Sequence, residues 1–123
     1  MDVIVTNNPL VSEKYKSRFR VDFSDTDLMG VFIHTRDLVH KGYILQTHPL
    51  TGGVKPNETF YKTVLLSEAS AELDLQSLKI IEETILTAEK FTHKNLPEQY
   101  KNDMQVVDLS LISPVLEARA KQL

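Results

Sequence analysis

The chain has 123 residues and a net charge of −3, and 41% of its residues are hydrophobic, with no cysteine among them. This size and composition predict one globular domain over residues 1–123, without disulfides, thiol catalysis or thiolate metal sites. We expect no nucleic-acid partner, because such binding normally needs a basic patch. The chain has no signal-peptide pattern and no apolar run near the ~20 residues of a membrane span, so we expect a cytoplasmic protein without a membrane partner.

The first part of the chain alternates strand and helix patterns. Residues 3–5 are apolar and β-branched, which predicts a buried strand. Asn8 is a good helix cap and Pro9 fits the first helical position, so we expect a helix to begin there and end near residue 16 or 18. Residues 19–23 alternate apolar and polar side chains, which predicts a second strand with one buried face.

The alternation continues toward the middle of the chain. Residues 28–41 carry apolar side chains at helical spacing, and Gly42 follows where a left-handed glycine commonly ends a helix. Residues 43–47 predict a third strand and residues 63–66 a fourth. The connection between these two strands is long enough for the fourth to run in either direction.

The last third of the chain has mainly helical patterns. Asp74 can cap a helix that extends to about residue 92. One stripe of this helix is apolar: Leu75, Leu78, Ile81, Ile85 and Ala88. A final helix begins near Pro97, and Pro114 should kink or divide it, because its ring removes an amide donor. A strand at residues 104–111 is the alternative for this segment.

The order of the predicted elements indicates an α/β fold. Parallel neighbouring strands need crossover connections, and both helices between the first three strands are long enough to supply them. We therefore expect a small Rossmann-like three-layer sandwich, with a four-stranded, mostly parallel sheet and helices on both faces.

Ligands of open α/β sheets bind beyond the carboxyl ends of the strands. Polar residues follow all four predicted strands: Thr6, Asn7 and Asn8; Ser24 and Asp25; Thr47 and His48; Ser67 and Glu68. We expect these residues to meet at one rim of the sheet. The helix that begins after Asn8 favours an anion at its N-terminus, although Asn8 as a simple cap is the alternative.

Residues 47–61 hold two of the four glycines and two of the five prolines, and loops of this length are usually functional or disordered. Paired glycines allow close backbone approach to a ligand, and the loop also has a histidine, a lysine and a glutamate. An Ω-loop whose polar groups satisfy one another is the alternative. The predicted ligand-binding residues are Thr6, Asn7, Asn8, Thr47, His48, Gly52, Gly53, Lys55, Asn57 and Glu58.

The sequence lacks the common motifs for phosphate binding, zinc binding and serine-hydrolase catalysis. There is no glycine-rich phosphate loop, no HExxH zinc motif and no GxSxG nucleophile elbow. His34 and His40 are six residues apart, which places them on different faces of a helix. We expect no metal site and no cofactor, and the pattern identifies no catalytic residue.

Four segments together resemble the GrdX family: residues 6–11, 36–42, 47–59 and 106–112. The segment 47–59 is the most specific of them. The resemblance implies a small cytoplasmic protein of anaerobic bacteria, encoded with the glycine, sarcosine or betaine reductase system. That system reductively deaminates its substrate and yields acetyl phosphate, through selenoprotein and thiol chemistry on other subunits. The resemblance implies no catalytic residue.

Three functions are open at this point. The leading hypothesis is an accessory or regulatory protein that binds a small anionic metabolite or a protein of the reductase system at the rim. The second is a small enzyme with His48 as acid or base, Glu58 as its partner and Lys55 as an anion clamp. The third is a structural module that forms a homo-oligomer through the apolar residues of segment 106–116.

Overall fold

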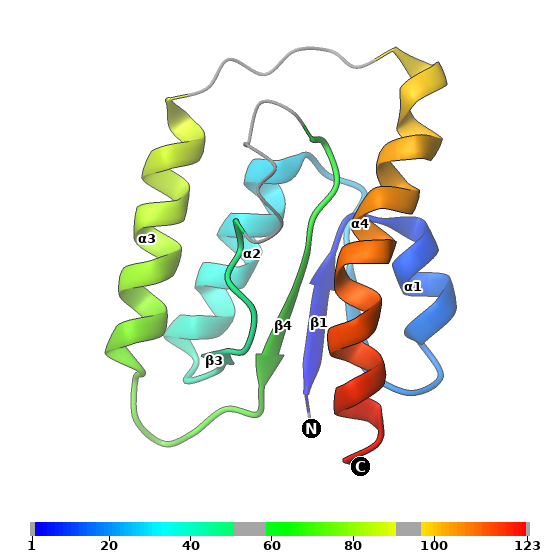
Figure 1. Ribbon diagram of the computed structural model, residues 1–123. Helices are drawn as coiled ribbons and strands as arrows, with labels where there is room; N and C mark the ends of the chain where they lie inside the picture. Colours follow the sequence, from blue (N-terminus) through cyan, green and yellow to red (C-terminus); the bar gives the residue numbers. More distant parts are fainter. Residues whose placement is uncertain (1, 51–58, 91–96, 123) are drawn as a thin grey trace.

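The computed structural model describes residues 2–50, 59–90 and 97–122. Within these residues, four strands form one sheet and four helices pack around it (Figure 1). The elements follow in the order β1 (Val3–Thr6), α1 (Pro9–Tyr15), β2 (Arg20–Phe23), α2 (Leu28–His40), β3 (Ile44–Leu45), β4 (Thr63–Ser67), α3 (Leu75–Glu89) and α4 (Glu98–Ala120). The predicted α/β class and element order are confirmed.

The sheet is mixed, with strand order β2-β1-β4-β3. β1 runs parallel to β2, whereas β4 runs antiparallel to both β1 and β3. The predicted mostly parallel sheet is therefore wrong, and the Rossmann-like topology is not confirmed. Parallel neighbours need a crossover, and the described residues between β3 and β4 contain no helix, so the chain returns from β3 in the opposite direction.

The direction of β4 decides which residues share an edge of the sheet. Thr6, the last residue of β1, pairs with Thr63, the first residue of β4. We call the edge that these two residues mark the carboxyl edge, because β1, β2 and β3 all end toward it. Ser67 and Glu68 lie at the other end of β4, so their predicted place at the common rim is wrong. Lys62 and Thr63, at the start of β4, lie at the carboxyl edge instead.

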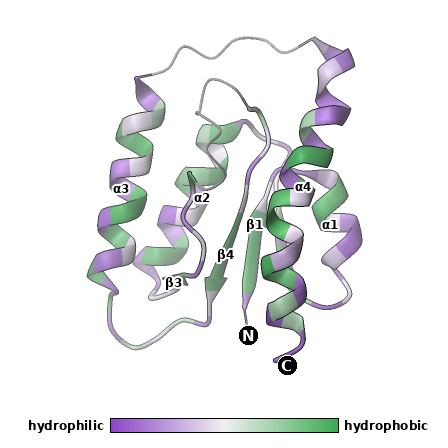
Figure 2. Cartoon of the chain, viewed as in Figure 1, coloured by the Kyte–Doolittle hydropathy of each residue, from purple (hydrophilic) through white to green (hydrophobic). Residues whose placement is uncertain are grey.

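Helices cover both faces of the sheet, as predicted. One core combines side chains of β1 and β4 with α2 and α3, and its strand residues are Val3, Val5, Val64 and Leu66. The other core combines Ile4 and Leu65 with α1 and α4. The apolar character of β1 and β4 is visible in Figure 2. Because successive strand residues point to opposite faces, these two strands supply both cores.

Short-range signals determine the ends of the helices. Asn8, Asp27 and Asp74 each accept a backbone N–H of the first turn of α1, α2 and α3, respectively. Gly42 ends α2 with φ of 99°, and a side chain there would collide with the Ser70 carbonyl. These features confirm the predicted starts of the three helices and the predicted end of α2, whereas α3 ends at Glu89, before the predicted end near residue 92. Leu75 is an exception within the predicted stripe of α3, because 72% of it is exposed.

β3 is shorter than its predicted range of residues 43–47. Beyond Leu45, the N–H groups of Gln46 and Thr47 both donate to the Leu65 carbonyl. The Leu65 N–H donates to Thr47 Oγ1 at 3.0 Å instead of to a backbone carbonyl. The threonine side chain thus replaces one backbone bond of the ladder, and regular pairing stops there.

α4 is one helix from Glu98 to Ala120, so the alternative strand at residues 104–111 is wrong. The expected division at Pro114 is also wrong. Both Pro114 and Ser110 are exposed, so water can replace the amide donor that the proline removes from the Ser110 carbonyl.

A buried polar cluster of Thr6, Asn8, Thr63 and Asp108 fixes α4 against the sheet. Asp108 is only 5% exposed, and its Oδ2 accepts from Thr63 Oγ1 at 2.7 Å and from Asn8 Nδ2 at 3.0 Å. Because the single Thr63 hydroxyl proton is used there, Thr6 Oγ1 donates to Thr63 Oγ1, also at 2.7 Å. Thr6 Oγ1 in turn accepts the Asn8 N–H. The cluster joins β1, β4 and α4 at the carboxyl edge.

We predict that Asp108→Ala lowers the free energy of unfolding by about 3 kcal/mol, because it leaves buried donors of Thr63 and Asn8 without an acceptor. Urea denaturation measures this change. Asp103→Ala is the matched control, because Asp103 is exposed on the same helix and surface changes usually stay within about 0.5 kcal/mol. Equal losses in the two variants would contradict a structural role for the cluster.

A second prediction concerns Glu117, which joins α4 to α1. Hydrogen bonds from Arg18 and Tyr15 lower the pKa of Glu117 to about 2 from an ordinary value of 4.5. A lowered carboxyl pKa stabilises the fold above pH 4.5, and this contribution is lost as the pH falls toward 2. We expect Glu117→Gln to be less stable than the wild type at pH 7, with the difference closing toward pH 2. Solvent screening keeps the effect modest, because Glu117 and Arg18 are both about 40% exposed.

Urea unfolding at a series of pH values tests this expectation. Glu13→Gln is the control, since Glu13 lies on the surface of α1 and pairs with Lys16 of its own helix segment. A gap between Glu117→Gln and the wild type that stays the same from pH 7 to pH 3 would show that the charge of Glu117 does not stabilise the fold.

Candidate functional site

Two adjoining hollows lie at the carboxyl edge, and both are lined by Lys62, Asp108 and Leu111. The first also reaches the start of α2 at Leu28 and Phe32. The second lies between α4 and the segment that follows β3. It contains about 360 Å³ of open space, including solvent at its mouth. We call this second space the His48 hollow, and its lining residues are Thr47, His48, Lys62, Thr63, Asp108, Leu111, Ile112 and Val115.

Lys62 supplies a positive charge to the His48 hollow. The residue is half-buried, and burial lowers the pKa of its ammonium group, while the Asp108 carboxylate acts in the opposite direction. Lys62 thus lies close enough to Asp108 for the two charges to interact. In such a poorly hydrated position, the attraction between the ammonium and an anion is stronger than in open water.

α4 supplies apolar side chains to the hollow in addition to Asp108. Leu111 and Val115 line it, and Val107 lies four residues before Leu111, on the same side of the helix. These three side chains are 42%, 40% and 49% exposed, respectively. The apolar surface of α4 therefore extends beyond the part that packs on the sheet, and Figure 2 shows apolar residues along this helix.

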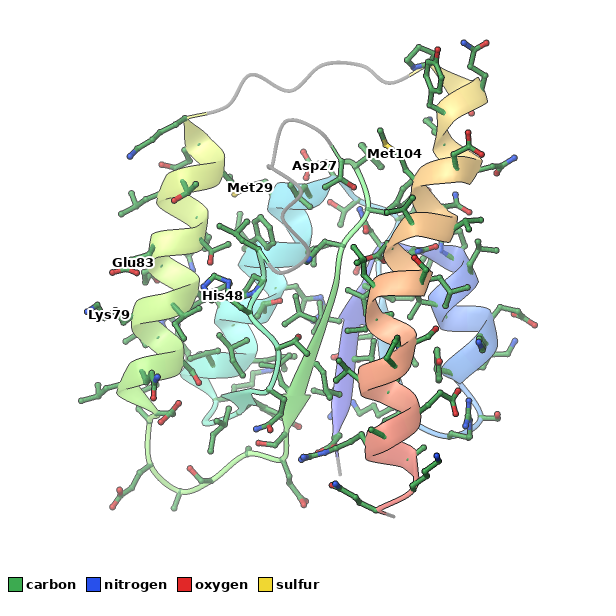
Figure 3. The ribbon with its side chains drawn as sticks, viewed as in Figure 1. Asp27, Met29, His48, Lys79, Glu83 and Met104 are labelled. Carbon is green, nitrogen blue, oxygen red and sulfur yellow. The ribbon has the colours of Figure 1, made fainter. Side chains whose placement is uncertain are left out.

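Thr47 and His48, two of the predicted binding residues, line the hollow. His48 is exposed on the segment after β3 (Figure 3), and its Nδ1 accepts the Leu50 N–H at 3.1 Å. A ring nitrogen that accepts a hydrogen bond carries no proton, so this bond occupies Nδ1 of the ring as an acceptor. Thr47 accepts the Leu65 N–H and cannot at the same time serve a ligand through that lone pair.

Thr6, Asn7 and Asn8 are buried beneath the edge, and protein groups bind their polar atoms. Asn7 Nδ2 donates to the carbonyls of Thr26 and Phe60, and Asn7 Oδ1 accepts the Lys62 N–H. Asn8 belongs to the buried polar cluster. In this arrangement the three side chains hold the edge together, and their direct contact with a ligand stays a prediction.

The remaining predicted residues are Gly52, Gly53, Lys55, Asn57 and Glu58, and all five lie outside the described part of the chain. The pairing of His48 with Glu58 and the anion clamp at Lys55 therefore stay predictions.

Sequence reasoning missed Lys62 and Asp108, the two charged residues of the hollow. Lys62 directly precedes the predicted fourth strand, so an antiparallel direction for that strand would have placed it at the carboxyl edge. Asp108 is the one charged residue in the apolar run of residues 106–112. Aspartate is rarely fully buried unless it is paired. A single aspartate within an apolar run therefore indicates a buried, hydrogen-bonded carboxylate, and this was the sequence signal that could have identified Asp108.

Residues 2–50, 59–90 and 97–122 contain no group of three His, Cys, Asp or Glu side chains that could hold a metal ion. None of the helices that the structure describes has the length and apolar character needed to cross a membrane.

Comparison with known proteins gives one result for nearly the whole chain. The family model described as GrdX-like protein matches residues 3–117. No curated protein and no solved structure matches the chain significantly. The match includes every strand, the first three helices and most of α4, with all the residues that line the His48 hollow. This chain therefore belongs to the GrdX-like family.

Proposed function

We propose that this GrdX-like protein is an accessory or regulatory protein of glycine, sarcosine or betaine reductase metabolism, and that it binds a small anionic metabolite in the His48 hollow. Family membership supports the link to the reductase system. The observation that carries the binding proposal is the half-buried Lys62, which lines an open hollow together with His48. A cation in a poorly hydrated hollow favours an anionic ligand.

A binding role fits the described residues better than a catalytic one. General acid–base catalysis needs a titratable side chain within hydrogen-bond reach of the proton that it moves. His48 Nδ1 accepts a backbone N–H, and Asp108 Oδ2 accepts two structural donors. Both of these atoms thus have roles in holding the local structure. The enzyme hypothesis of His48 with Glu58 and Lys55 stays a prediction, because Glu58 and Lys55 lie outside the described residues.

The exposed apolar side of α4 favours a second candidate function, the binding of another protein chain. Val106 and Val107 are about half exposed, and Leu111 and Val115 are nearly as exposed. Contiguous exposed apolar residues commonly mark protein contacts. The self-association hypothesis for residues 106–116 rests on this surface.

Thermal unfolding with acetyl phosphate, inorganic phosphate, glycine and betaine tests the metabolite proposal. At a free ligand concentration of about 100 times Kd, binding adds about 2.7 kcal/mol, which raises Tm by roughly 10 °C in a domain of this size. We expect at least one of these compounds to raise Tm in the wild type, and Lys62→Met to remove the increase.

Lys79→Met is the control for this experiment, because Lys79 is exposed on α3, away from the hollow (Figure 3). It should respond like the wild type. No increase in Tm with any of the four compounds, at concentrations well above a plausible Kd, would remove the metabolite branch of the proposal.

Light scattering at several protein concentrations tests the second candidate. If the exposed side of α4 carries self-association, the wild type is a dimer or larger at high concentration and Val107→Asp is a monomer. Leu75→Asp changes another exposed apolar residue, on α3, and should behave like the wild type. A wild-type monomer at every concentration would exclude stable self-association.

A further inference from the structure

The walls of the His48 hollow are partly polar and partly apolar. Thr47, His48 and Lys62 supply polar groups on the side of β3 and β4, and α4 supplies the Asp108 carboxylate together with the apolar side chains of Leu111 and Val115. A ligand that matches only the polar groups leaves the apolar surface exposed to water. A ligand with both an anionic and an apolar part would use both, and burial of its apolar part would add to its affinity.

The charges beside the hollow suit one negative charge on the ligand. Lys62 is close enough to Asp108 for the two charges to interact, so its positive charge is partly balanced inside the protein. Of the lysine, arginine, aspartate and glutamate side chains in the described part of the chain, Lys62 and Asp108 line the hollow. One ammonium beside one carboxylate compensates a dianion such as phosphate less well than a monoanion.

The ammonium group of Lys62 can serve two acceptors at once. It has three N–H donors, so it can hold a ligand carboxylate while it keeps its interaction with Asp108. Asp108 itself stays in place, because Thr63 and Asn8 hold its Oδ2. Lys62 and Asp108 thus both line the hollow, with their charges close enough to interact.

We infer that the His48 hollow binds a small monocarboxylate with a short apolar group, with Lys62 at the carboxylate and Leu111 and Val115 at the apolar end. This inference rests on the proposed function and names the chemical class of its ligand.

Calorimetric titration with acetate, propionate, butyrate and inorganic phosphate, at constant ionic strength, tests the inference. A buried methylene contributes about 0.8 kcal/mol, so we expect Kd to fall about fourfold for each added methylene. Lys62→Met should weaken binding of every carboxylate at least tenfold, and Lys62→Arg should retain most of the affinity. Val115→Thr has nearly the same shape and should flatten the dependence on chain length.

The outcomes separate this inference from the proposed function. Binding of phosphate without binding of any carboxylate would overturn the inference and leave the proposed metabolite site intact. Carboxylate binding that Lys62→Met does not weaken, or chain-length dependence that Val115→Thr does not change, would also overturn the inference. If none of the four anions binds, and the compounds of the thermal experiment also fail, the metabolite branch of the proposed function is wrong as well. Lys79→Met must match the wild type throughout.

Discussion

The carboxyl edge depends on one buried acceptor, Oδ2 of Asp108. It receives hydrogen bonds from Thr63 and from Asn8, which are 45 and 100 residues away in the sequence. A buried carboxylate is costly unless donors satisfy it, so the three segments must come together for α4 to dock in this position. The same contact brings Leu111 and Val115 into the lining of one hollow with Lys62. The hollow is therefore a consequence of how α4 is attached to the sheet.

The attachment also explains why α4 leaves apolar side chains exposed. Ile112 and Leu116 are buried with α1 in the second core, and Glu117 fixes the adjoining side of the helix to Tyr15 and Arg18. With these contacts satisfied, Val107, Leu111 and Val115 project beyond the area that the sheet and α1 can cover. An apolar helix surface that is wider than its packing partner provides the apolar part of the lining of the hollow.

Local features of this fold were predictable from sequence, and distant pairings were not. The caps at Asn8 and Asp74 and the left-handed Gly42 depend on residues within a few positions, so their sequence signals were sufficient. The direction of β4 depends on its partners β1 and β3, which no local pattern of residues 63–66 specifies. Lys62 and Asp108 meet only when β4 is antiparallel and α4 packs over it. Thr47 and His48 were therefore predicted at the edge where the hollow lies, whereas Lys62 and Asp108 were not, and ligand binding at this edge stays a prediction.

The chemistry of the edge gives a physical reason to favour binding over catalysis. Asp108 is the buried acid of the hollow, and its hydrogen bonds to Thr63 and Asn8 hold α4 in place. If Asp108 took up a proton in each cycle of a reaction, the acceptor of these bonds would weaken and the docking of α4 would weaken with it. A carboxylate that maintains the fold is poorly suited to proton transfer. This role is compatible with the proposed binding of a small anion, for which Lys62 would supply the positive charge beside the hollow.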